Sequence, residues 1–396
     1  MSITLGEHAP LSTMPKWSWF SSGGLRFRAV VWQTLAAAIV CAVAALIANQ
    51  TAANLKERGI ASGFDYLSRA TGFEISPGPL SYSSRDTYLR ALAVGLINTL
   101  RVSLLGIAIA TLLGVIVGVA RLSKTWVVAT IARVYVEILR NTPLLLQLLF
   151  WYSLSQALPS PPHALRPLPG IFLCVRGLFM PRLVWNGTYL WFIAFGLILL
   201  LASPLTLKVY AKRRSRTLPA VLVSVGMLVG MLVIATLTKP RPSVKLETPA
   251  LTGFNFQGGL SISPEFAALL IGLSTYTAAF IGEIVRGGIL AVDRTQTEAA
   301  KALGLSRFQT LRVIILPQAL RVIIPPATSQ FLNLTKNSSL AVAIGYPDLI
   351  SISNTTLNQT GQAIEAITVV MLIYLAISLG IALTANLYNR SVMQRG

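Results

Sequence analysis

Two clusters of polar residues interrupt long apolar segments, and they hold the side chains best able to bind a small polar ligand. The first cluster follows Arg140 and contains Thr142 and Gln147 on either side of Pro143. The second gathers five polar residues in one short stretch: Asn333, Lys336, Asn337, Ser338 and Ser339. Polar groups at membrane depth are costly and mark substrate paths. Together these groups could bind both ends of a small zwitterion, so they predict a translocation path, although each alone could simply hold helices together.

Catalytic and metal-binding patterns are absent from the sequence. It contains no phosphate-binding loop with lysine, no Gly-x-Ser-x-Gly and no His-Glu-x-x-His. The histidines, His8 and His163, have no cysteine or second histidine at ligand spacing. Cys41 and Cys174 lie far apart in apolar surroundings. We therefore expect no catalysis by this chain, and no metal or cofactor in it.

The composition is that of a protein that crosses a membrane several times. Of the 396 residues, 54% are hydrophobic and 12% are charged, whereas soluble domains average about 25% charged residues. The formal net charge is +20, but the basic residues are dispersed between apolar segments and form no single basic face. We therefore expect contact with membrane lipid and none with nucleic acid.

Apolar segments of about 20 residues, the length that spans a bilayer as a helix, predict an all-α polytopic bundle of about eight spanning helices. The expected spans are residues 29–49, 88–120, 131–158, 190–207, 218–237, 266–290, 322–344 and 364–387. The third begins as a polar helix and becomes apolar after Pro143. On the second, Gly114 and Gly118 permit a close helix contact, which we expect inside the bundle.

The spans divide the chain into a main domain and short flanking parts. Residues 1–28 form a tail, and 29–87 hold the first helix and an external segment. Residues 88–390 form the main transmembrane domain, with an outer insertion and extra helices at about 159–264, and 391–396 form a second tail. The proline-rich part of the insertion, 159–185, is too broken to span. Residues 345–361 are expected to form a short external hairpin.

Basic residues orient the bundle. They are enriched before residue 29, around 121–140, at 208–216, at 286–321 and after 390. The side of the membrane that carries more lysine and arginine is the cytoplasmic side. Both termini and the polar stretch 295–317 are therefore expected in the cytoplasm.

The polar stretch 295–317 predicts two short helices joined by a glycine. A capping box opens each helix, a left-handed glycine separates them, and a proline disturbs the second helix at its far end. The residues concerned are, in order, Thr295, Glu298, Gly304, Ser306, Gln309 and Pro317. A rigid, basic helix–glycine–helix unit outside the membrane is suited to being held by a soluble partner.

Two charged residues near these segments allow more than one interpretation. Glu283 can pair with Arg286 one turn away or with Arg140, and a structural ion pair is favoured over a ligand role. Lys336 can extend towards an interface, contact a substrate carboxylate, or pair with Asp348 across the outer turn.

The polar stretch resembles the EAA loop of ABC-importer permeases. The matching positions are Glu298, Ala299, Ala300, Gly304, Ile314, Leu316 and Pro317. In that family the loop holds the coupling helix, which docks into a groove on the ATPase subunit. The resemblance therefore implies a cytoplasmic coupling helix here, with ATP and Mg bound by a partner ATPase. One departure is Thr295, where many relatives have glycine.

Both polar clusters are also similar to motifs of the polar amino-acid permeases among ABC importers. Arg-x-Thr-Pro with a downstream glutamine is matched by Arg140, Thr142, Pro143 and Gln147, and Lys-x-(Ser/Thr)-Ser-Leu by Lys336, Ser338, Ser339 and Leu340. The resemblance covers roughly 89–158 and 266–388. With its extra segments, the chain is most similar to the Q-type permease of general L-amino-acid transport systems.

The resemblance implies a permease subunit of an L-amino-acid importer in a bacterial inner membrane. Its implied partners are an ABC ATPase dimer, a second related permease in a heterodimer, and a periplasmic amino-acid-binding protein. Two alternatives are considered. An ion-coupled secondary amino-acid transporter would favour acidic residues at the membrane midplane, and a membrane-embedded enzyme or structural subunit would carry other motifs. Neither feature is evident in the sequence.

Overall fold

The computed structural model describes residues 22–57, 59, 62–76, 78–185, 226, 229 and 244–393. The α-helices in these ranges are α1 (Ser22–Glu57), α2 (Tyr88–Ala120), α3 (Trp126–Asn141), α4 (Leu144–Gln156), α7 (Pro264–Leu290), α8 (Arg294–Ala302), α9 (Arg307–Gln309), α10 (Leu316–Asn337), α11 (Leu349–Thr360) and α12 (Ala363–Met393). Short 3-10 helices are η1 (Asp65–Ser68), η2 (Pro161–His163) and η4 (Ser338–Ile344), and η3 (Thr310–Ile315) is π-helical. The strands are β1 (Leu165–Leu168), β2 (Ile171–Cys174), β3 (Gly177–Met180), β4 (Arg182–Trp185), β5 (Val244–Glu247), β6 (Ala250–Thr252), β7 (Asn255–Gln257) and β8 (Leu260–Ile262).

Five helical segments in the described part of the chain are long and apolar enough to cross a membrane. They are Val30–Thr51, Tyr88–Ala120, Pro264–Leu290, Thr310–Ile344 and Ala363–Asn386. These segments match the first, second, sixth, seventh and eighth predicted spans. The predicted fourth and fifth spans, 190–207 and 218–237, lie outside the described residues except for 226 and 229.

The predicted third span is two helices and not one. Thr142 and Pro143 have extended backbone between α3 and α4, because proline lacks an N–H and disfavours helical backbone in the residue before it. The second helix, α4, has 13 residues. At about 1.5 Å per residue it is about 20 Å long, shorter than the hydrocarbon core of about 30 Å.

Helix α7 is the centre of the bundle and packs against α2, α3, α4 and α10. Two glycines of α2 allow a close approach to α7. A Cβ atom at Gly114 would lie 2.6 Å from Cβ of Ile281, and one at Gly118 would lie 2.7 Å from the carbonyl oxygen of Gly282. The predicted glycine contact is therefore inside this chain. The neighbouring core contains four fully buried leucines: Leu148, Leu269, Leu273 and Leu334.

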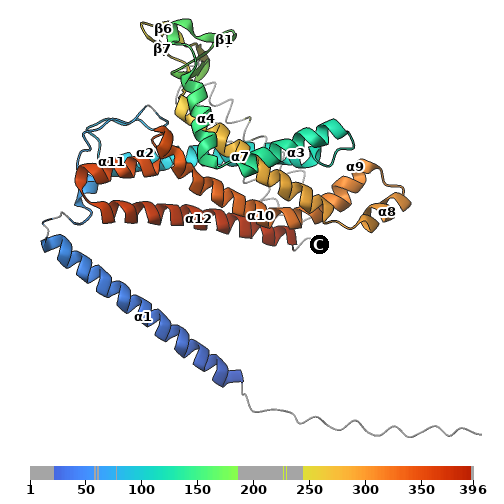
Figure 1. Ribbon diagram of the computed structural model, residues 1–396, viewed down its shortest axis with the longest axis horizontal. Helices are drawn as coiled ribbons and strands as arrows, with labels where there is room; N and C mark the ends of the chain where they lie inside the picture. Colours follow the sequence, from blue (N-terminus) through green and yellow to red (C-terminus); the bar gives the residue numbers. More distant parts are fainter. Residues whose placement is uncertain are drawn as a thin grey trace, which may run out of the picture.

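Residues 165–185 and 244–262 form β-strands, so the all-α prediction is wrong for this insertion. Strands β1, β2, β3 and β8 form an antiparallel sheet in that order, while β4 pairs with β5 and β6 pairs with β7. Alternating apolar residues between prolines and glycines suit short strands that bury one face. That face holds a small core of Cys174, Phe179 and Phe256. The strands lie beyond the C-terminal end of α4 (Figure 1).

Helix α11 (Leu349–Thr360) occupies most of the segment 345–361, where the sequence predicted a hairpin. Asp348 caps the helix by accepting a hydrogen bond from the Ser351 N–H at 2.8 Å. Gly361 ends it at φ +70°. The helix packs against α2 at Gly95, where a Cβ would lie 2.9 Å from Cα of Leu349. A local cap at each end and this close contact explain the helix.

The bundle has two ends that differ in character. Helix α7 begins directly after β8, at what we call the sheet end, and it leads to α8 and α9 at the opposite end (Figure 1). Helix α1 is longer than the predicted first span, and it stands apart from the other helices in Figure 1.

Candidate functional site

The helix–glycine–helix unit at the α8–α9 end is present, but its first cap differs from the prediction. The carboxylate of Asp293 accepts a hydrogen bond from the Thr295 N–H at 2.9 Å. Asp293, and not Thr295 with Glu298, therefore caps α8. Hydrogen bonds from the Thr295 backbone, then from its side chain, hold the pKa of Asp293 below its ordinary value. The helix begins one residue earlier than Thr295 for this reason.

The glycine and the second capping box are confirmed. Gly304 has φ +75°, a left-handed conformation that L-residues other than glycine rarely adopt. The Ser306 N–H donates to Oε1 of Gln309 at 2.8 Å, and the Gln309 N–H donates to Oγ of Ser306 at 3.3 Å. Gly304 therefore ends the first helix, and the reciprocal hydrogen bonds cap the second helix directly after it.

Pro317 disturbs the second helix, as predicted, but does not end it. The helix continues through α9 and η3 directly into α10, and Pro317 lies in the first turn of α10. Because proline has no N–H, a carbonyl in the preceding turn loses its partner, and residues 310–315 widen into a π-helix there. The helix–glycine–helix unit is thus joined to α10 without a loop.

The unit has an exposed apolar surface between the candidate spans Pro264–Leu290 and Thr310–Ile344. Leu303 is 79% exposed and Phe308 is 69% exposed. Glu298, Ala299 and Gly304 are exposed around them, as are Leu316 and Pro317, while Ile314 is half-buried. Ala300 is fully buried where α8 packs on η3. An exposed apolar surface with a fixed backbone is typical of a protein–protein contact.

The first polar cluster stabilises the break between α3 and α4. Gln147 donates from Nε2 to the carbonyl oxygens of Leu139 at 2.9 Å and Thr142 at 3.0 Å. The Thr142 hydroxyl donates to the Ile138 carbonyl at 2.8 Å. These bonds satisfy carbonyls that the end of α3 leaves without partners. Oε1 of Gln147 is buried and has no hydrogen-bond partner in the described residues.

The second polar cluster divides between two faces. Ser338 is fully buried and donates to the Thr335 carbonyl at 2.7 Å, whereas Ser339 donates to the Lys336 carbonyl at 2.7 Å. Asn333 and Lys336 are exposed, and Asn337 is half-buried. Helix α4 packs against η4, so the structure brings the two clusters into neighbouring positions. The described residues leave Asn333 and Lys336 of α10 uncovered.

Lys336 forms no ion pair with Asp348 among the residues that the structure describes. Asp348 is fully buried, whereas Lys336 is exposed. Burial raises the pKa of Asp348 to about 7, against hydrogen bonds from backbone N–H groups that lower it. Neighbouring hydrogen bonds, from Asn98 to the Pro347 carbonyl at 2.9 Å and from the Leu349 N–H to Thr99 at 3.1 Å, tie this turn to α2.

Glu283 holds together two helices near the α8–α9 end. Its carboxylate pairs with Arg286 at 2.6 Å on α7, as the sequence suggested, and also with Arg121 at the end of α2. Arg140 is not a partner, because its guanidinium lies over the Phe280 ring, 5.1 Å from the centroid. The pairing of Arg121 with Glu283 was not predicted, because the two residues are far apart in sequence and only the close packing of α2 on α7 brings them together.

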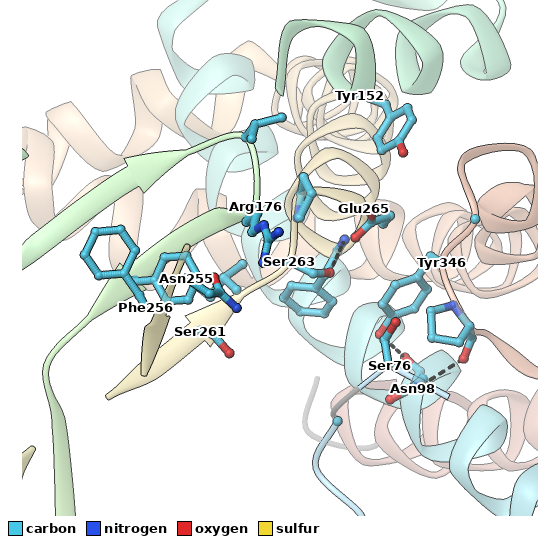
Figure 2. Close-up of a pocket in the computed structure, with 18 of the residues that line it drawn as sticks. Ser76, Asn98, Tyr152, Arg176, Asn255, Phe256, Ser261, Ser263, Glu265 and Tyr346 are labelled. Atoms are coloured by element: carbon cyan, nitrogen blue, oxygen red, sulfur yellow. Dashed lines mark hydrogen bonds between the residues drawn. The ribbon is translucent and has the colours of Figure 1, made fainter. Parts of the chain in front are cut away.

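A cavity of about 720 Å³ lies at the sheet end, between the strands and the bundle (Figure 2). Its walls come from the segment before α2, from α2, the end of α4, the β2–β3 turn, the start of α7 and the turn after η4. Its charged residues are Arg101, Arg176 and Glu265. None of the three was predicted as a site residue from the sequence. Arg101 carried an available signal, because it is a charge inside an otherwise apolar span.

Comparisons with known proteins place these features among transport proteins. Residues 209–395 match the family described as "Binding-protein-dependent transport system inner membrane component". The putative amino-acid ABC transporter permease protein YhdX of Escherichia coli is 45% identical over 92% of this chain and 94% of its own length. The general L-amino acid transport system permease protein AapQ of Rhizobium johnstonii is 39% identical over 92% of each chain. A crystal structure described as an amino acid ABC transporter with histidines aligns with a TM-score of 0.46 at 22% identity, over 77% of this chain and 95% of that chain.

Proposed function

Because this chain belongs to the permease family of binding-protein-dependent ABC transporters, we propose that it is the amino-acid-conducting subunit of an ATP-driven importer. The observation that carries the proposal is the identity of 45% and 39%, over more than nine-tenths of the chain, to proteins named as amino-acid permeases. The proposed substrates are L-amino acids. The same membership argues against the ion-coupled secondary transporter considered from the sequence.

Coupling to the ATPase is assigned to the EAA loop, which spans α8, Gly304 and the start of α10. The exposed Leu303 and Phe308 support a docking role, since they form an apolar surface outside the bundle. The continuous helix from α9 into α10 supports a mechanical role, because movement of the docked unit would be carried into a spanning segment. ATP and Mg are bound by the partner ATPase dimer.

The translocation path is assigned to the second polar cluster together with the α3–α4 break. Asn333 and Lys336 are exposed on a candidate span, and polar groups facing lipid there would be costly. A second, related permease that covers this face of α10 removes the cost and places the path between the two chains. We assign Gln147, Ser338 and Ser339 to the same path because α4 packs against η4, and Thr142 shapes the break.

The proposed topology has about eight spans in a bacterial inner membrane, with both termini and α8–α9 in the cytoplasm. The sheet end then faces the periplasm, where a binding protein delivers the amino acid. The basic residues of the α8–α9 end support this orientation.

Affinity purification from native membranes in mild detergent tests the assembly. We expect the tagged chain to retain an ABC ATPase, a second permease and, when substrate is added, a periplasmic binding protein. Reconstitution of the purified complex should then give amino-acid uptake that requires ATP. A homodimer that transports amino acids into liposomes without ATP would refute the proposal.

A further inference from the structure

We propose that the cavity at the sheet end binds a free amino acid. The carboxylates of the ligand contact Arg101 and Arg176, and its ammonium group contacts Glu265. The inference rests on the proposed function, because it names a second site for the same class of substrate. The cavity volume of about 720 Å³ falls within the range of about 300–1,000 Å³ that is common for small-molecule sites. It would hold the substrate before the polar cluster of α10 does.

The charges of the cavity have no partners within the described chain. Its three charged side chains, Arg101, Arg176 and Glu265, form no ion pair with a described residue. By contrast, Arg90 on the same helix as Arg101 pairs with Asp86 at 3.4 Å and donates to the Ser81 carbonyl at 2.8 Å. Charges that line a cavity without partners are available to a ligand of complementary charge.

Arg101 is held in place by stacking. Its guanidinium carbon lies 4.4 Å from the centroid of the Phe266 ring. Phe266 is buried and lies 5.8 Å from the Tyr346 ring, centroid to centroid. Stacking uses the flat face of a guanidinium and leaves the N–H groups at its edge free. Arg101 is therefore positioned in advance to donate to a carboxylate, which lowers the entropic cost of binding.

Arg176 belongs to a tightly fixed turn. The adjacent Val175 N–H donates to the Pro159 carbonyl at 2.9 Å. Gly177 has φ +121°, and a Cβ there would overlap the Ile262 carbonyl oxygen, so only glycine fits. Figure 2 shows Arg176 near Asn255, whose Oδ1 is buried and accepts no hydrogen bond from the described residues.

Glu265 lies in the first turn of α7, next to the Ser263 cap, whose Oγ accepts from the Phe266 N–H at 3.2 Å. A carboxylate there is compatible with the helix dipole, so its presence costs α7 nothing. The Glu265 carboxylate gives the cavity a charged acceptor at the start of α7. An α-ammonium group requires such acceptors.

The ratio of charges favours an acidic amino acid. Two guanidinium groups and one carboxylate complement a ligand with two carboxylates and one ammonium. A neutral zwitterion would leave one guanidinium without a partner, and a basic amino acid would add a cation beside two others. We therefore expect affinities in the order L-glutamate, L-glutamine, L-lysine.

The test measures binding to the full-length chain, with the permease that copurifies with it, in nanodiscs free of binding protein. Isothermal titration uses L-glutamate, L-glutamine, L-lysine and glutarate, which has both carboxylates but no ammonium. Arg101→Ala or Arg176→Ala should weaken glutamate binding about 10- to 100-fold, the effect of losing one charge-assisted hydrogen bond. Glu265→Gln should weaken glutamate binding by a similar factor but leave glutarate binding unchanged.

Two controls lie outside the cavity. Arg166→Ala removes an arginine that lies over Phe172, with 5.5 Å from guanidinium to centroid, and Asp65→Asn removes an exposed carboxylate; both should bind glutamate as the unaltered chain does. Absence of glutamate binding, or equal losses in the controls, would overturn the inference. If ATP-driven uptake with the binding protein persists while direct binding is absent, this inference fails and the proposed function stands. If direct binding occurs but uptake does not require ATP, the proposed function fails instead.

Discussion

Gly304→Ala is the substitution that most directly tests coupling through the α8–α9 end. Gly304 has φ +75°, and no atom lies within 4 Å of the position that a Cβ would take, so nothing obstructs a methyl group. The whole cost therefore comes from the backbone, and a left-handed conformation costs an L-residue about 1–2 kcal/mol. That free energy corresponds to a factor of about 5–30 in an equilibrium. We expect the fraction of chains that hold the docking geometry to fall by up to this factor.

Gly361→Ala is the matched control. Gly361 has φ +70° and equally open surroundings, so its replacement carries the same backbone cost, but it ends α11, far along the chain from the docking unit. Both variants should reach the membrane at similar levels. Only Gly304→Ala should lower the amount of ATPase recovered with the permease and the rate of ATP-driven amino-acid uptake in proteoliposomes. Equal uptake by the two variants would refute the assignment of coupling to this unit.

Three further substitutions test the bundle itself. Glu283→Gln should leave two arginines uncompensated and destabilise the α2–α7 contact by about 1 kcal/mol, since the pair is partly exposed; thermal unfolding in detergent should detect a lower Tm, with no comparable loss in Arg140→Ala. Gly114→Ala would place a Cβ 2.6 Å from Cβ of Ile281 and should destabilise the folded chain by about 1–3 kcal/mol. Gly287→Ala, where a Cβ would have no atom within 4 Å, should not destabilise it. Similar Tm values for the two variants would contradict the close packing of α2 on α7. The pKa of Asp348 is raised to about 7, so its contribution to stability is full below about pH 4 and is lost as pH rises through about 7. Tm should therefore fall from pH 5 to pH 8 more in the unaltered chain than in Asp348→Asn. An identical pH dependence of the two Tm values would exclude this role.

Features set by neighbouring residues were predictable from the sequence. The stop at Gly304 and the reciprocal bonds of Ser306 with Gln309 follow from residue types three positions apart. The first cap was mispredicted because Asp293, just upstream, competes with Thr295 and accepts the bond. Five of the predicted spans could be found because about 20 apolar residues in succession leave few alternatives.

Features that depend on distant contacts were not predictable. β8 joins β3 across an insertion, so neither strand could be recognised from its own few residues. Arg121 reaches Glu283 only because α2 and α7 pack closely. Likewise, Arg101 and Glu265 line one cavity only after the strands fold over the bundle. Sequence spacing carries no signal for such pairs in a single chain.

Helix α7 runs uninterrupted from the sheet end to the α8–α9 end of the molecule. It starts two residues after β8, which is hydrogen-bonded into the sheet, and it ends four residues before α8. Its 27 residues form a rod of about 40 Å at about 1.5 Å per residue, clamped along its length by α2. We expect a tilt of the sheet to displace α8, with α7 pivoting at its close contact with Gly114 and Gly118.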